Sequence, residues 1–263
     1  MMKNTQVVLL AGGLGTRISE ETDRMPKPMV PIGIRPILWH IMKIYAAHGH
    51  TDFILCLGYK GEIIKDWFRN LRWMTSDVKL TLGDSAEPMF YGDPEEMGWT
   101  ITLADTGEET MTGGRLKRIE KYIGNDKEFL ITYGDGVGSI DVNASIDFHR
   151  EQNRVLTLTG VRPPGRWGEI DVTDGLVTNF FEKPQTSNGH INGGFFVANR
   201  ALFNYLNDDP KLIFEQGPLN SISSDKQLAC YVHEGFWQPM DTYQEFMLLN
   251  RLWNEGKAEW KIW

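Results

Sequence analysis

A run of glycines near the N-terminus has the spacing of a phosphate-binding turn. The apolar residues 7–10 lead directly into Gly12, Gly13 and Gly15, which predicts a buried strand that ends in a tight loop. Glycines allow positive φ angles and let consecutive N–H groups face an anion such as a nucleotide phosphate. The order of residues excludes both the Walker loop and the dinucleotide-binding fingerprint, so the glycines alone are equally consistent with an ordinary turn.

Two cations follow these glycines and favour the phosphate-binding interpretation. Arg17 offers a planar fork of donors for phosphate oxygens, and Lys27 offers a compact point charge. Pro26 and Pro28 flank Lys27 and restrict the backbone on both sides of it. We therefore expect a phosphate site with its own local positive charge.

Carboxylates follow two apolar segments further along the chain. Asp135 lies between two glycines after the apolar residues 129–132, where an Asp suits a divalent cation and equally suits solvent. Asp241 precedes a predicted helix over 243–255, which it could simply cap. Two threonines and two glycines, Thr110, Thr112, Gly113 and Gly114, precede a predicted helix over 115–123 whose free N–H groups could bind a ligand or an ordinary cap.

Alternating strand and helix patterns predict an α/β fold. Predicted strands over 7–10, 52–57, 99–105, 129–132 and 155–161 alternate with predicted helices over 36–48, 59–71 and 141–152. This order predicts a mostly parallel sheet flanked by helices, with ligands at the carboxyl ends of its strands. Shorter strands are predicted over 169–172, 176–181 and 193–198. Residues 83–98 lack periodicity and are predicted to be a loop, either a mobile flap or disordered.

Composition limits the class of partner and the location of the protein. The 263 residues, 41% hydrophobic, suffice for a single large core. The net charge of -8 argues against a nucleic-acid partner, which would require a basic face. No apolar stretch approaches the length needed to span a membrane, and no signal peptide is recognisable. We therefore expect a cytoplasmic protein with no membrane partner.

The combined pattern L-A-G-G-x-G-T-R-I and P-K-P-M resembles the signature of the sugar-1-phosphate nucleotidylyltransferases, also called sugar-nucleotide pyrophosphorylases. The resemblance implies a single Rossmann-like domain over residues 1–263. Its nucleotide-binding half would extend to about residue 160, followed by a smaller β-rich half that binds the sugar phosphate and by a C-terminal helix. It also implies Mg²⁺ as cofactor, bound by Asp135 and Asp241.

The same resemblance assigns roles to individual residues. It implies catalytic roles for Arg17, Lys27 and Asp135. The implied nucleotide-binding residues are Leu10, Ala11, Gly12, Gly13, Leu14, Gly15, Thr16, Arg17, Lys27, Thr110, Thr112, Gly113, Arg115 and Gly134. The implied sugar-phosphate residues are Gly168, Glu182, Lys183, Asn192 and Gly193.

The segment T-G-G-R resembles the cytidylyl branch of that family in particular. This implies transfer from CTP to glucose 1-phosphate for dideoxysugar and O-antigen polysaccharide synthesis, by a homo-oligomer that could be a hexamer. A thymidylyl or uridylyl transferase would use the same scaffold. A glycosyltransferase would normally have an Asp-x-Asp motif, whereas Gly136 and Val137 follow Asp135 here. A non-catalytic nucleotide-sugar-binding regulator would be expected to have lost Lys27, Asp135 or Asp241.

Overall fold

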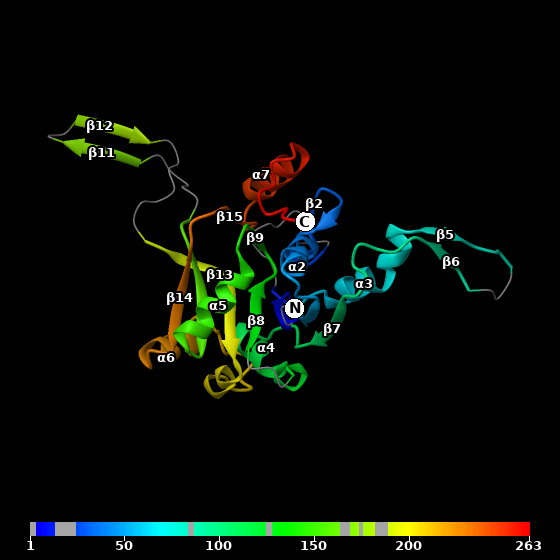
Figure 1. Cartoon of the computed structure of the whole chain (residues 1–263), viewed down its shortest axis with the longest axis horizontal. Coiled ribbons are helices and arrows are strands. Elements are labelled where there is room, and N and C mark those ends of the chain that lie inside the picture. The colour runs from blue at the N-terminus through cyan, green and yellow to red at the C-terminus, as the bar shows by residue number, and fades with distance from the viewer. Residues whose placement is uncertain are drawn as a thin grey trace.

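The fold is taken from a computed structural model, which describes residues 4–13, 25–83, 87–124, 128–163, 169–173, 176–181 and 189–263. A seven-stranded sheet lies at its centre (Figure 1). Its strands are β1 (Val7–Leu10), β4 (Asp52–Leu57), β7 (Thr100–Asp105), β8 (Glu128–Tyr133), β10 (Leu156–Val161), β13 (Ile191–Asn199) and β14 (Leu228–His233). The order across the sheet is β14-β10-β13-β8-β1-β4-β7, and every neighbouring pair is parallel except the two that involve β13. The predicted α/β fold with a mostly parallel sheet is confirmed.

Helices cover both faces of the sheet, and each face has its own apolar core. On one face pack α2 (Ile37–Ala47), α3 (Gly61–Thr75), α5 (Val142–Gln152) and α7 (Tyr243–Asn254). On the other pack α4 (Thr112–Arg118), α6 (Pro218–Ser224) and the 3-10 turn η3 (Arg200–Tyr205). Strand β1 shows why the sheet is covered twice: Val7 and Leu9 belong to the first core, while Val8 and Leu10 belong to the second.

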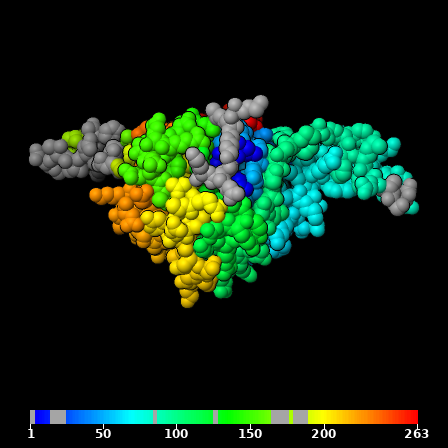
Figure 2. Space-filling view, turned by 60° about the horizontal axis from the view of Figure 1, so that its bottom comes forward, coloured from blue at the N-terminus to red at the C-terminus, as the bar shows by residue number. Residues whose placement is uncertain are grey.

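Four two-stranded ribbons and two further 3-10 turns complete the described structure. The ribbons are β2 (Pro31–Ile32) with β3 (Arg35–Pro36), β5 (Asp77–Lys79) with β6 (Met89–Tyr91), β9 (Gly136–Gly138) with β15 (Trp237–Pro239), and β11 (Glu169–Thr173) with β12 (Leu176–Phe181). The 3-10 turns are η1 (Lys27–Met29) and η2 (Glu120–Tyr122). Ribbons β5–β6 and β11–β12 project from opposite sides of the body in Figure 1, and the β5–β6 arm stands out again in Figure 2.

The β5–β6 ribbon corrects one prediction. Residues 83–98 were expected to lack regular structure, but Met89–Tyr91 form a strand that pairs with Asp77–Lys79. The end of the segment is also anchored to the body, because Glu96 is buried and accepts a hydrogen bond from the indole N–H of Trp39. The three-residue strands are too short to show a periodicity, and their pairing partner lies on the other side of the turn.

We expect the two ends of this segment to respond differently to mutation. Replacing residues 80–88 with a two-residue Asn-Gly turn should change the free energy of unfolding little, because the described side chains there are exposed or only half-buried. Glu96→Ala should lower the free energy of unfolding by about 1–3 kcal/mol, because it removes the acceptor of a buried indole N–H. Urea denaturation of both variants would measure this. The expectation would be contradicted if shortening residues 80–88 lowered the free energy of unfolding strongly while Glu96→Ala left it unchanged.

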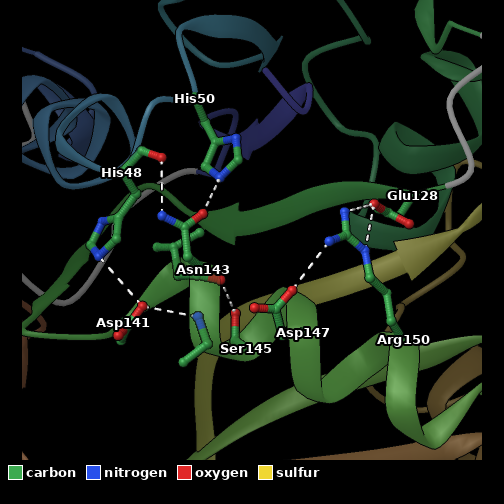
Figure 3. A network of polar contacts seen from close by, with 10 residues as sticks. His48, His50, Glu128, Asp141, Asn143, Ser145, Asp147 and Arg150 are labelled. Atoms are coloured by element: carbon green, nitrogen blue, oxygen red, sulfur yellow. Dashed lines mark hydrogen bonds and ion pairs between the residues drawn. The ribbon is translucent and has the colours of Figure 1, made fainter. Parts of the chain in front are cut away.

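A polar network ties α5 to the turn before β4 (Figure 3). His50 Nδ1 accepts a hydrogen bond from the Thr5 backbone N–H at 3.1 Å, so its Nε2 must carry the proton that it shares with Asn143 Oδ1 at 3.2 Å. The amide of Asn143 donates to the His48 carbonyl at 3.2 Å, and Asp141 caps α5 by accepting from the Ala144 N–H. The predicted helix over 141–152 thus begins after its Asp cap.

Buried neutral histidines make the stability of this fold sensitive to acid. Burial lowers the pKa of His40 to about 4, and burial also lowers the pKa of His50 and of His149. These groups stay neutral in the folded state while their unfolded counterparts are protonated below about pH 6.5. The contribution of these histidines to the free energy of unfolding should therefore be fully present above pH 6.5 and should be lost as the pH falls towards 4. His40 should account for about 3 kcal/mol of this loss.

Urea denaturation at pH 7.5 and 4.5 would measure this loss. In His40→Gln the difference between the two pH values should shrink, because the variant has no buried imidazole at this position. An unchanged pH difference in His40→Gln would show that other groups cause the acid sensitivity.

In the part of the chain that the structure describes, no helix is both long enough and apolar enough to cross a membrane.

Candidate active site

A cavity opens at the carboxyl ends of β1 and β8 and brings together most of the predicted residues that the structure describes. Leu10 and Tyr133, the last residues of these two strands, both line it. The predicted site residues that line it are Leu10, Gly12, Gly13, Lys27, Thr110, Thr112, Arg115, Gly134, Asp135 and Asp241. Ala11 is fully buried beneath it, and Gly113 is buried within α4. The position agrees with the rule that ligands of parallel sheets bind at the strands' carboxyl ends.

Lys27 lies between two carboxylates at one end of this cavity. Its ammonium is 2.6 Å from Asp135 Oδ2 and 2.5 Å from Asp241 Oδ1. The 3-10 turn η1 holds the side chain in place, because the Met29 N–H donates to the Pro26 carbonyl at 2.8 Å and both prolines restrict the backbone. Pro28 also packs against Gly134, where a Cβ would lie 3.0 Å from its ring. The turn therefore fixes Lys27 relative to the end of β8.

The short ribbon β9–β15 explains why two aspartates so distant in sequence meet. Gly136 pairs with Pro239, and the Met240 N–H donates to the Asp135 carbonyl at 2.8 Å. Antiparallel pairing therefore places Asp135 and Asp241 at the same end of the ribbon, beside the glycine loop. The sequence suggested that each aspartate follows a strand and that the fold could bring both to one side of the glycine loop, but it did not show the ribbon that does so.

Asp241 does not cap the helix that follows it. Thr242 is the N-cap of α7, accepts from the Glu245 N–H at 3.3 Å, and forms a capping box with the Glu245 side chain. The Glu245 carboxylate also accepts from the backbone N–H groups of Asp241 and Thr242. The side chain of Asp241 therefore points to Lys27 instead of to the helix.

The ionisation of Lys27 reflects two opposing effects. Burial acts to lower the pKa of Lys27, but the charge of Asp135 and the hydrogen bonds to Asp135 and Asp241 outweigh it, so the pKa is raised above its usual value. The side chain is therefore a permanent cation at neutral pH. It separates two carboxylates that would otherwise repel one another across a partly buried space.

The two carboxylates suit the Mg²⁺ ion that the sequence pattern implies. Magnesium is typically bound by one or two carboxylates plus substrate phosphates and water, and here two carboxylates already converge on one cationic atom. No group of three or more histidine, cysteine or acidic side chains able to hold a metal occurs among the described residues. If Mg²⁺ binds here, Asp135 and Asp241 would hold it together with oxygens of the substrate phosphates.

Arg115 stabilises the glycine loop through hydrogen bonds to the backbone. Its two terminal nitrogens donate to the carbonyls of Leu57, Gly12 and Glu108 and to the hydroxyl of Thr106, at distances from 2.7 to 3.1 Å. A Cβ on Gly12 would come within 2.3 Å of this guanidinium. Close packing by Arg115 therefore explains the glycine at position 12.

The two described glycines of the loop do not use the positive φ angle that glycine allows. Neither Gly12 nor Gly13 has a positive φ. A Cβ on Gly13 would meet no atom within 4 Å, which fits a residue that borders the open cavity.

The start of α4 differs from the prediction. The helix begins at Thr112, not at Arg115, so Thr112, Gly113 and Gly114 lie inside it. The N–H groups of Gly113 and Gly114 donate to the Leu212 carbonyl at 2.9 and 3.3 Å, so they are not free for a ligand. Both glycines are required by close packing, because a Cβ there would lie 2.7 Å from the Leu212 side chain or 2.8 Å from the Asp209 carbonyl.

A second, smaller cavity adjoins the first and contains the described part of the predicted sugar side. Asn192 and Gly193 line it, and Tyr133 and Asp135 border both cavities. The Trp237 indole N–H donates to the Gly193 carbonyl at 2.8 Å. The predicted residues Leu14, Gly15, Thr16, Arg17, Gly168, Glu182 and Lys183 lie outside the described residues.

Several residues at these cavities were not predicted to be site residues. Tyr133, Met111, Pro28 and Trp237 line one or both cavities. Glu215 accepts hydrogen bonds from Tyr133 and Thr112. Tyr133 adjoins the predicted Gly134-Asp135 step and could have been included on that ground, whereas Glu215 follows the apolar residues 212–214 without a recognisable motif.

The sequence and fold comparisons agree with this arrangement. Residues 6–251 match the family model described as nucleotidyl transferase. The chain belongs to the nucleotidyl transferase family. It is 48% identical over 258 residues to the glucose-1-phosphate cytidylyltransferase of Salmonella typhimurium, covering 98% of this chain and 99% of that relative. It is 28% identical to the D-glycero-alpha-D-manno-heptose 1-phosphate guanylyltransferase of Campylobacter jejuni, over 93% of this chain and 100% of that one.

Solved structures support the fold of this nucleotidyl transferase. HddC from Yersinia pseudotuberculosis superposes with a TM-score of 0.68 at 24% identity, over 95% of this chain and 99% of that one. An apo UDP-glucose pyrophosphorylase gives a TM-score of 0.68 at 15% identity, over 97% and 100% of the two chains. At these identities the similarity concerns the fold alone.

Proposed function

We propose that the chain transfers a cytidylyl group from CTP to α-D-glucose 1-phosphate, giving CDP-glucose and pyrophosphate. The observation that carries this proposal is the 48% identity, across almost the whole chain, to a relative named glucose-1-phosphate cytidylyltransferase. The cavity supports the type of reaction, because it places a buried cation and two carboxylates beside a glycine loop.

The proposed chemistry needs no general base. A sugar phosphate has a second pKa near about 6, so at neutral pH it is already a dianionic nucleophile. One of its oxygens attacks the α-phosphorus of the nucleotide, a new P–O bond forms, and the bond to the β-phosphate oxygen breaks as pyrophosphate leaves. The protein must hold the two anions in line and offset their repulsion.

Residues of this chain would share those tasks. Lys27 supplies a fixed positive charge at the end of the cavity, and the loop at Gly12 and Gly13 lets phosphates approach the backbone. Bound Mg²⁺ would supply further neutralisation of phosphate charge. Arg17 and Lys183 are proposed to add charge on the nucleotide and sugar sides. Gly168, Glu182, Asn192 and Gly193 are proposed to bind the sugar phosphate.

A pyrophosphate-release assay over a matrix of substrates tests this function. CTP, UTP, dTTP and GTP would each be paired with glucose 1-phosphate and with other sugar 1-phosphates. CTP with glucose 1-phosphate should give the highest kcat/KM. A higher value with dTTP or UTP would replace the proposed base, and nucleotide binding without turnover of any pair would indicate a regulatory protein.

We also propose a homo-oligomer, such as a hexamer, acting in the cytoplasm, where CTP is available. Exposed apolar side chains support the association: Leu80, Met89 and Tyr91 on or beside the β5–β6 arm, and Tyr243 and Met247 on α7. Light scattering coupled to size-exclusion chromatography would measure the mass. A monomer at assay concentration would refute the association.

A further inference from the structure

Glu215 connects the walls of the two cavities. One of its carboxylate oxygens accepts a hydrogen bond from the Tyr133 hydroxyl, and the other accepts from the Thr112 hydroxyl at 2.7 Å. Thr112 in turn accepts from the Phe214 N–H at 2.9 Å. A single carboxylate therefore holds one hydroxyl from the end of β8 and one from the start of α4.

The backbone around Glu215 is itself fixed against α4. The Met111 N–H donates to the Pro210 carbonyl at 2.7 Å, in addition to the bonds from Gly113 and Gly114 to Leu212. Residues 209–215 thus follow the first turn of the helix at close range. Glu215 is held by the same contacts that define one wall of the larger cavity.

Tyr133 is the side chain that the two cavities share. It lines both, and it directly precedes the Gly134-Asp135 step. Its ring packs on Gly194, where a Cβ would lie only 2.5 Å from a ring carbon. The Asn192 amide lies 3.5 Å from its hydroxyl and donates towards it. The orientation of Tyr133 therefore affects the space on the nucleotide side and on the sugar side together.

We infer that Glu215 is a positioning residue for the proposed transfer, acting through Tyr133 and Thr112 to set the alignment between the nucleotide cavity and the sugar cavity. This inference rests on the proposed function, which identifies the two substrates. Glu215 touches neither reacting group. Its effect should therefore fall on the geometry of in-line attack more than on the binding of either substrate.

A double-mutant cycle with Tyr133 tests this role. Glu215→Ala and Tyr133→Phe should each lower kcat tenfold or more, with KM for each substrate changed less than threefold. The double variant should lose no more than about twofold beyond the worse single variant, because both changes break the same contact. Glu215→Gln should recover part of kcat, since its amide oxygen can still accept from Tyr133.

Tyr205 provides the matched control. Its hydroxyl donates to Asp225 at 2.9 Å in an exposed tyrosine–carboxylate pair outside both cavities, so Tyr205→Phe should leave kcat unchanged. The inference would be overturned if the fold losses in kcat of the two single variants multiplied in the double variant. It would also be overturned if Glu215→Ala kept the wild-type kcat, or if the variants lost only melting temperature.

The cycle would use whichever substrate pair the wild type turns over fastest. Failure of CTP with glucose 1-phosphate would then reject the proposed substrates and leave the result on Glu215 intact.

Discussion

Replacing Lys27 with alanine is expected to lower kcat/KM by at least tenfold, equivalent to about 1.4 kcal/mol of transition-state stabilisation. The ammonium is the cation held between Asp135 and Asp241, so its loss leaves two carboxylates facing one another where phosphates must also bind. The fold should survive, because the turn that carries Lys27 is held by backbone hydrogen bonds and two prolines. Steady-state pyrophosphate release would measure the loss.

Lys257 is a suitable control for this experiment. It forms an ion pair with Glu255 at 2.8 Å, but its side chain is 69% exposed and remote from the cavity. Lys257→Ala should therefore retain wild-type turnover. If Lys27→Ala lost less than tenfold in kcat/KM, Lys27 would have only a structural role.

Asp135→Asn and Asp241→Asn are each expected to abolish Mg²⁺-dependent turnover. An amide has nearly the shape of a carboxylate but no charge, so each variant should fold while losing a ligand of the proposed metal site. Each should also weaken Mg²⁺ binding in the presence of nucleotide, which isothermal calorimetry measures independently of activity. With a single carboxylate left, the metal and the nucleotide phosphates should no longer bind cooperatively.

Asp147→Asn separates a general charge effect from a specific one, because Asp147 is exposed and pairs only with Arg150 in the contacts described for it. It should bind Mg²⁺ and turn over like the wild type. Wild-type turnover of Asp135→Asn or Asp241→Asn at limiting Mg²⁺ would show that the two aspartates do not share a metal.

Apolar periodicity predicted the main elements well. Strands β1, β4 and β12 have the predicted bounds, and α2 and α5 differ by one residue at one or both ends. The ribbons β5–β6 and β9–β15 were missed, because three-residue strands such as Gly136–Gly138 carry no periodic pattern. Their formation depends on partners that lie elsewhere in the chain. The bounds of α4 were wrong because Gly113 and Gly114, poor helix formers, are stabilised by packing on residues 209–212.

The candidate site could be predicted only in part. Motif resemblance singled out Lys27, Asp135 and Asp241, and the structure brings them together. The family resemblance placed Arg115 among the nucleotide-binding residues, but its terminal N–H groups are donated to the backbone and Thr106. Glu215 could not have been found, because its role depends on a non-local contact between residues 209–215 and α4. Whether the individual residues bind substrate stays a prediction.

The reversed strand β13 has a consequence for how acceptor preference could be exchanged between relatives. The chain leaves the sheet after Val161 and re-enters at Ile191, and these two residues are paired neighbours. The intervening residues 162–190, which include the β11–β12 ribbon, therefore begin and end at the same end of the β10–β13 pair, beside Asn192. They form one continuous insertion between two neighbouring strands. A transplant of it from another family member would test the proposal that Gly168, Glu182 and Lys183 bind the sugar phosphate, and we expect it to leave the order of the seven strands unchanged.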